Sequence, residues 1–94
     1  MKLLKNERID IMANTKSVKI SLNTIDKVKE FSNIIARQVP DCDLVAESNR
    51  YIIDAKSIMG IFSLDLSKNL NLVIHSENQA EYDAVVAAIK AFIV

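Results

Sequence analysis

Residues Asp54 to Asn69 read D-A-K-S-I-M-G-I-F-S-L-D-L-S-K-N and contain Gly60, the only glycine in the chain. The pattern predicts the end of a strand, a serine, one short apolar helix and a polar stop. Its apolar residues are too many for one core-facing stripe, and they are Ile58, Met59, Ile61, Phe62, Leu64 and Leu66. We expect Ile61 and Leu64 to reach the core. Ile58, Met59 and Phe62 would then be left for a partner protein.

The flanking sequence predicts four strands and two longer helices around this segment. Apolar and polar residues alternate in the strands, whereas apolar residues recur every three or four positions in the helices. The expected strands are 17–22, 41–46, 51–55 and 70–75, and the expected longer helices are about 25–38 and 79–92. The order β-α-β-β-α-β-α predicts an α+β open-faced sandwich, in which helices cover one face of a four-stranded antiparallel sheet.

Both longer helices are expected to bury an apolar stripe. Thr24 is the expected N-cap of the first helix, since threonine oxygens accept hydrogen bonds from free amides there. The first stripe comprises Ile25, Val28, Phe31, Ile34 and Ile35. The second comprises Ala80, Ala84, Val85, Ala88, Ile89 and Phe92.

Length and composition indicate one folded domain, because half of the 94 residues are hydrophobic. We expect residues 17–94 to form it and residues 1–16 to be an extension, either disordered or an edge strand, with Met12 as an alternative start. The formal net charge is zero. This balance argues against a nucleic-acid or membrane surface, which needs excess basic charge. The N-terminus lacks the apolar core of a secretion signal, so we expect a cytoplasmic protein.

The sequence offers few motifs for conventional catalysis, and we expect neither an enzyme nor a cofactor. The sequence has no glycine-rich phosphate loop and no nucleophile-elbow motif. One cysteine and one histidine are too few for a Cys/His zinc site, so no metal is expected. His75 is expected to lie exposed at the end of a strand, without an obvious local companion for metal binding or general-base chemistry. Cys42 is expected to pack as a small hydrophobe.

Ser57 is the most interesting polar residue. Because it precedes the short apolar helix, the simplest interpretation is an N-cap. The functional alternative is a phosphorylation site, where a phosphate would meet free helix amides. The neighbouring Lys56 is expected to pair with that phosphate.

The stretch Ala55 to Lys68 resembles the regulatory-serine segment of the HPr family, the histidine-containing phosphocarriers of the bacterial phosphoenolpyruvate-dependent sugar phosphotransferase system. The resemblance extends over about Ser17 to Val94 and implies the same fold. It implies that Ser57 is the serine phosphorylated by a dedicated HPr-type kinase. It also implies a partner-binding surface, formed by Lys56, Ile58, Met59 and Phe62.

The first helix departs from the family. The family carries its phosphoryl group on a histidine within G-L-H-x-R-P, but residues 24–30 here read T-I-D-K-V-K-E. Asp26 or Lys27 takes the histidine position, and Val28 or Lys29 takes that of the arginine. An aspartate can in principle form an acyl phosphate, whereas a lysine is charged at neutral pH. A catabolite-repression branch of the family also keeps the serine, lacks the histidine and acts by binding.

Three functional hypotheses follow. The first is a regulatory binding module switched at Ser57, with an HPr-type kinase, a transcriptional regulator or phosphotransferase-system components as partners. The second is a phosphocarrier with an altered acceptor. The third is a structural or oligomerisation module, and a homodimer is one alternative for its oligomeric state.

Overall fold

The computed structural model describes residues 15–46 and 51–94. Expectations for residues 1–14, and for a turn at 47–50, lie outside the described residues. The elements, in chain order, are β1 (Thr15–Ile20), α2 (Ile25–Ile35), β2 (Asp41–Ala46), β3 (Ile52–Asp54), α3 (Ile58–Phe62), β4 (Leu70–His75), α4 (Gln79–Ala88) and the 3₁₀ turn η1 (Lys90–Phe92). This order confirms the predicted β-α-β-β-α-β-α arrangement.

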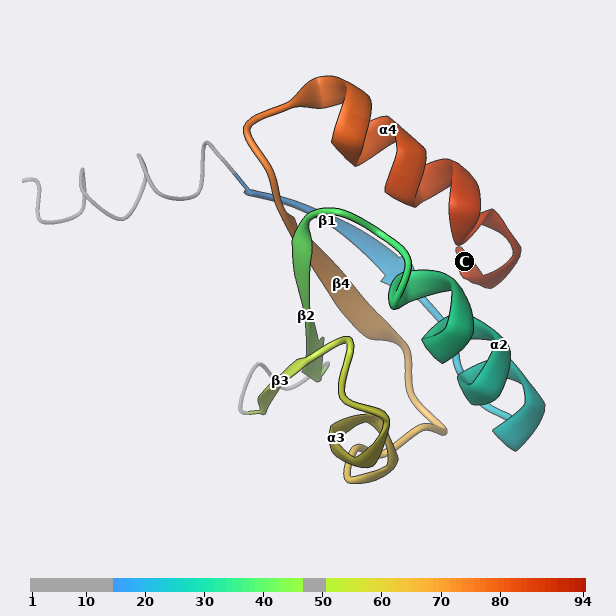
Figure 1. Ribbon diagram of the computed structural model, residues 1–94. Coiled ribbons are helices and arrows are strands. Elements are labelled where there is room, and N and C mark those ends of the chain that lie inside the picture. The colour runs from blue at the N-terminus through green and yellow to red at the C-terminus, as the bar shows by residue number, and fades with distance from the viewer. Residues whose placement is uncertain (1–14, 47–50) are drawn as a thin grey trace, which may run out of the picture.

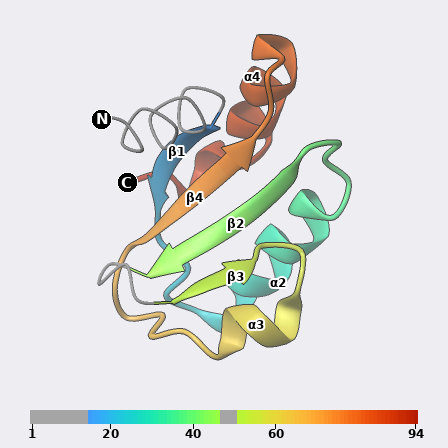
Figure 2. The ribbon, with the colours of Figure 1, turned by 90° about the vertical axis from the view of Figure 1, so that its left-hand side faces the viewer.

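The four strands form one antiparallel sheet in the order β1-β4-β2-β3. In the central strand β4, Leu72 pairs with Val18 of β1 and with Leu44 of β2. Figure 2 shows the sheet nearly face on, with helices behind it, and Figure 1 shows α2 and α4 together on one side. The fold is therefore the predicted open-faced sandwich, with one face of the sheet uncovered by helices.

The core lies between the sheet and the helices. Outside the sheet, α2 contributes Val28, Phe31 and Ile35, while the rings of Phe31 and Phe92 meet edge to face at 5.7 Å. No polar or charged residue is buried in the part of the chain that the structure describes. The sheet contributes Ile20, Cys42, Leu44, Leu70, Leu72 and Ile74. Burial of this apolar surface is the main source of stability.

The three helices begin at side-chain caps. The Thr24 hydroxyl accepts from the amide of Lys27 at 3.1 Å, as the sequence predicted. The side-chain oxygen Oδ1 of Asn78 accepts from the amide of Ala80 at 2.8 Å. Such caps satisfy amides that have no partner within the helix.

Some of the predicted helical stripes are wrong in detail. Ile25 is 62% exposed, because it lies in the first turn of α2, before the helix packs on the sheet. Ala80 and Ala84 are also exposed. Val85 and Ile89 are buried as predicted, and Tyr82 and Val86, which the prediction left out, pack against the core beside them. These positions also recur at helical spacing, and their larger side chains remove more apolar area from water than alanines would.

Candidate functional site

Ser57 is positioned by the turn that leads from β3 into α3. The amide of Ala55 donates to the carbonyl of Cys42 at 2.9 Å, which continues the sheet pairing beyond β3. The carboxylate of Asp54 then accepts from the amide of Lys56 at 2.9 Å, and its carbonyl accepts from the amide of Ser57 at 2.9 Å. The turn thus fixes the direction in which Ser57 enters the helix.

The Ser57 side chain is the N-cap of α3, as predicted. Its hydroxyl oxygen accepts from the amide of Gly60 at 3.2 Å, and Ser57 is exposed to solvent. Among the described residues, the hydroxyl donates no hydrogen bond. The O–H group is therefore accessible for modification without breaking a donated bond.

The apolar side chains of α3 divide into a buried set and an exposed set. Ile61 is fully buried and Leu64 is 8% exposed, so these two hold the segment to the core. By contrast, Ile58 is 39%, Met59 is 78% and Phe62 is 45% exposed. We call the exposed set, Ile58, Met59 and Phe62, the α3 surface. Single exposed apolar residues are ordinary, but three from one short helix are typical of a binding surface.

Gly60 allows α3 to lie close to β3. A Cβ atom at this position would come within 3.3 Å of the Ile53 Cβ atom and 3.3 Å of the Ser57 hydroxyl oxygen. The glycine is thus explained by close packing of helix on strand rather than by an unusual backbone angle. It also leaves room for the cap of Ser57.

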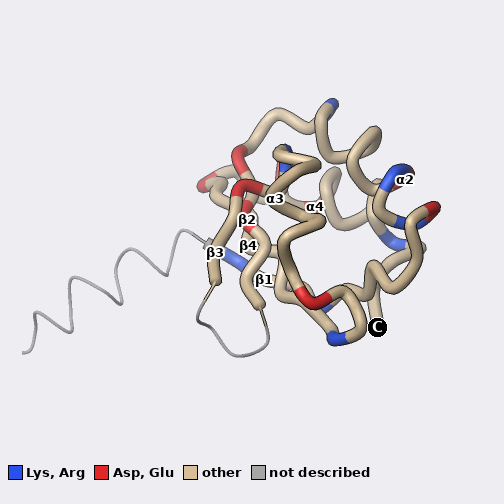
Figure 3. The backbone as a smooth tube through the Cα atoms, turned by 90° about the horizontal axis from the view of Figure 1, so that it is seen from below, with Lys and Arg blue, Asp and Glu red and all other residues tan. Residues whose placement is uncertain are grey.

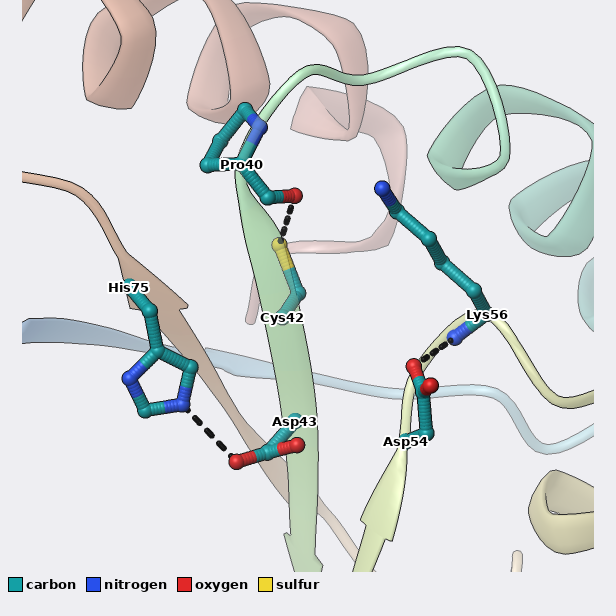
Figure 4. Close-up of polar contacts among 6 residues, drawn as sticks. All are labelled: Pro40, Cys42, Asp43, Asp54, Lys56 and His75. Atoms are coloured by element: carbon teal, nitrogen blue, oxygen red, sulfur yellow. Dashed lines mark hydrogen bonds and ion pairs between the residues drawn. The ribbon is translucent and has the colours of Figure 1, made fainter.

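Lys56 makes a contact that the sequence did not predict. Its ammonium donates to the carbonyl of Gln38, beyond the end of α2, at 2.9 Å. Figure 4 shows the Lys56 side chain extending away from the turn that holds Asp54. The lysine thus ties α3 to the end of α2, because it satisfies a carbonyl that has no partner within the helix.

One comparison with known proteins identifies the family of the chain. The sequence model of the family described as "PTS HPr component phosphorylation site" matches residues 27–94, which is more than half of the chain. The chain belongs to the HPr family. No curated protein and no solved structure gives a significant match. HPr proteins are phosphocarriers rather than enzymes, and they bind other proteins of the phosphotransferase system.

The start of α2 is where the HPr resemblance placed the phosphoryl acceptor. Asp26 is exposed in the first turn, and Lys27 is half-buried beside it. The family match begins at Lys27, so Asp26 lies just outside it. Both side chains remain candidates for the acceptor position.

His75, the only histidine of this HPr-family chain, lies at the end of β4. The β1–β4 register pairs Leu70 with Ile20, close to the start of α2, whereas His75 pairs with Thr15 at the opposite end of β1. It therefore does not take the place of the family histidine in space.

His75 has a companion that lies far from it in the sequence. Its Nε2 atom lies 2.8 Å from a carboxylate oxygen of Asp43 on β2, and Figure 4 shows the ring turned toward that carboxylate. Both residues point outward from neighbouring strands. Sequence reasoning missed Asp43 because nothing local indicates that β2 pairs with β4. The two side chains are 40% and 35% exposed, so the contact is solvent-screened.

Cys42 is buried, as expected for a small packing residue. Its thiol lies 3.7 Å from the carbonyl of Pro40, and burial raises its pKa to about 11. Since the thiolate is the reactive form, this cysteine is chemically inert near neutral pH.

Residues 15–46 and 51–94 contain neither a candidate metal cluster nor a candidate membrane-spanning helix. No group of three histidine, cysteine, aspartate or glutamate residues could hold a metal ion there. No helix of that part is both long and apolar enough to cross a bilayer. Figure 3 shows acidic and basic residues on several elements of the described chain.

Proposed function

We propose that this HPr-family chain is a regulatory protein-binding module, in which phosphorylation of Ser57 switches the α3 surface. The observation that carries the proposal is the position of an exposed N-cap serine directly beside three exposed apolar residues. The family match supports the phosphotransferase system as the setting. An HPr-type kinase, a transcriptional regulator and other components of that system are the proposed partners, in the cytoplasm.

Phosphorylation at Ser57 would change the charge of the surface more than its shape. The oxygen that now accepts from the Gly60 amide would remain bonded to the side chain and could keep accepting. Helix α3 is only five residues long, so local amides rather than a large helix dipole would stabilise the phosphate. A dianion would then lie beside Ile58 and Met59.

The partner would need a matching surface. Since Lys56 is bonded to Gln38, no neighbouring lysine of the turn is assigned to the phosphate. We expect the partner to supply an arginine or lysine for the phosphate and an apolar hollow for Met59, the most exposed of the three α3 side chains.

The first experiment locates the phosphate. The full chain is incubated with an HPr-type kinase, ATP and magnesium, and the product is mapped by mass spectrometry. Ser63 is a matched control, because it is an exposed serine at the other end of α3. We expect one phosphoryl group on the wild type and on Ser63→Ala, and none on Ser57→Ala. Absence of phosphate from Ser57 in the wild type would contradict the proposal.

The same preparation also tests the competing phosphocarrier. Phosphoenolpyruvate and the first general enzyme of the phosphotransferase system are added in place of kinase and ATP. A label that disappears in Asp26→Asn or Lys27→Met would assign a carrier with an altered acceptor. We expect no transfer, since the histidine and the arginine of the family motif are both replaced in this chain.

A further inference from the structure

A cavity lies at the end of α3 opposite Ser57. It is open to solvent, has a volume of about 580 Å³ and lies between the end of β2 and the segment that joins α3 to β4. Its apolar wall is formed by Ala46, Tyr51, Leu64 and Leu70. Sites for small molecules typically have volumes of about 300–1,000 Å³ and mostly apolar walls. The cavity therefore has the size and lining of a ligand site.

The rim of the cavity carries one charge of each sign. Asp65 and Lys68 both line it and come from one turn, in which the Lys68 amide donates to the Asp65 carbonyl at 3.3 Å. Their side chains form no ion pair with each other within the described structure. Neither charge is therefore neutralised by a direct contact with the other.

The carboxylate of Asp65 is held in place by Ser67. One oxygen accepts from the Ser67 amide at 3.1 Å and from its hydroxyl at 2.6 Å. These hydrogen bonds hold the pKa of Asp65 below its ordinary value, so the group is charged at neutral pH. The second carboxylate oxygen accepts no hydrogen bond from another described residue.

We infer that this cavity binds a free amino acid with a large apolar or aromatic side chain. The ammonium group would meet Asp65, the carboxylate would meet Lys68, and the side chain would contact Tyr51 and Leu64. A simple anion would be repelled by Asp65, and a simple cation by Lys68. A zwitterion satisfies both charges. The inference is independent of the Ser57 proposal, since it uses different residues.

The test is a titration of the ¹⁵N-labelled full chain with L-phenylalanine, followed by NMR. We expect saturable shifts of the amides of Ala46, Tyr51, Leu64 and Lys68, with a dissociation constant on the order of 1 mM for a ligand of this size. Two analogues that each lack one charge, 3-phenylpropionate and 2-phenylethylamine, should bind roughly tenfold more weakly.

Three variants complete the test. Lys68→Met keeps most of the length of the side chain but removes its charge, and Asp65→Asn keeps an oxygen for Ser67. Each should weaken the binding of L-phenylalanine roughly tenfold. Lys90→Met, which changes an exposed lysine on η1, should have no effect on that binding. The inference is overturned if no saturable shift occurs up to about 20 mM. It is also overturned if either analogue binds as tightly as L-phenylalanine, or if Lys68→Met and Asp65→Asn bind like the wild type.

Discussion

The attachment of α3 to the core depends chiefly on Ile61, and replacing it with alanine should be costly. Ile61 is the one residue of α3 that is fully buried. The substitution removes three buried carbon atoms, which at about 0.8 kcal/mol each gives about 2.4 kcal/mol. The cavity left behind adds to this figure, so we expect a total of about 3–4 kcal/mol.

This loss is large compared with the stability of a chain of this size. A domain of 94 residues has a free energy of unfolding of roughly 5–14 kcal/mol. With a urea m-value of about 1.5 kcal/mol per M, a loss of 3 kcal/mol lowers the midpoint by about 2 M. Circular dichroism in urea measures this shift directly. Hydrogen exchange at the Ile61 amide, which donates to the Ser57 carbonyl at 3.0 Å, reports whether α3 loosens locally first.

Met59→Ala is the matched control on the same helix. Met59 is 78% exposed, so its removal should change the free energy of unfolding by less than about 0.5 kcal/mol. The division of α3 into a buried and an exposed set would be refuted in two ways. One is a loss below about 1 kcal/mol for Ile61→Ala; the other is an equal loss for Met59→Ala.

Three further predictions concern other parts of the fold. Because the pKa of Cys42 is raised from 9.0 to about 11, the folded state holds the thiol proton more tightly than the unfolded state. The contribution of this thiol to the free energy of unfolding should therefore be fully present below about pH 9 and be lost as the pH rises toward 11. Urea titrations should show no such pH dependence for Cys42→Ala. Removing the exposed His75–Asp43 contact by Asp43→Asn should cost less than about 1 kcal/mol, and added salt should shrink even that difference. Gly60→Ala should not raise the free energy of unfolding by the roughly 1 kcal/mol that is usual within helices, because the added Cβ would press on Ile53. A raised urea midpoint would contradict this contact.

The fold was predictable because its elements carry strong local patterns. Leu70, Leu72 and Ile74 alternate with polar or outward residues, and all three are buried as the alternation predicted. The error in α4 arose where two stripes competed in the sequence. Alanines fit either face of a helix, so only the packing of Tyr82 against the core decides between them.

The candidate site was predictable only in part. Ser57 and the α3 surface were found because cap, glycine and apolar residues lie together in the chain. The contacts of Lys56 with Gln38 and of His75 with Asp43 were missed, because each joins residues that are distant in sequence. The cavity was missed for the same reason. Its walls come from the end of β2, from Tyr51 just before β3, and from the segment after α3.

The shortness of α3 links the two proposed sites physically. A helix of five residues does not form on its own, so its conformation depends on Ile61, Leu64 and the close fit at Gly60. Ser57 begins this helix, and the cavity lies at its other end, where Leu64 forms part of the wall. A phosphate on Ser57 would leave the buried contacts unchanged, because the hydroxyl donates no hydrogen bond among the described residues and its oxygen could keep accepting from the Gly60 amide. The switch that we propose therefore acts on the charge of the docking surface, while the core keeps α3 in place.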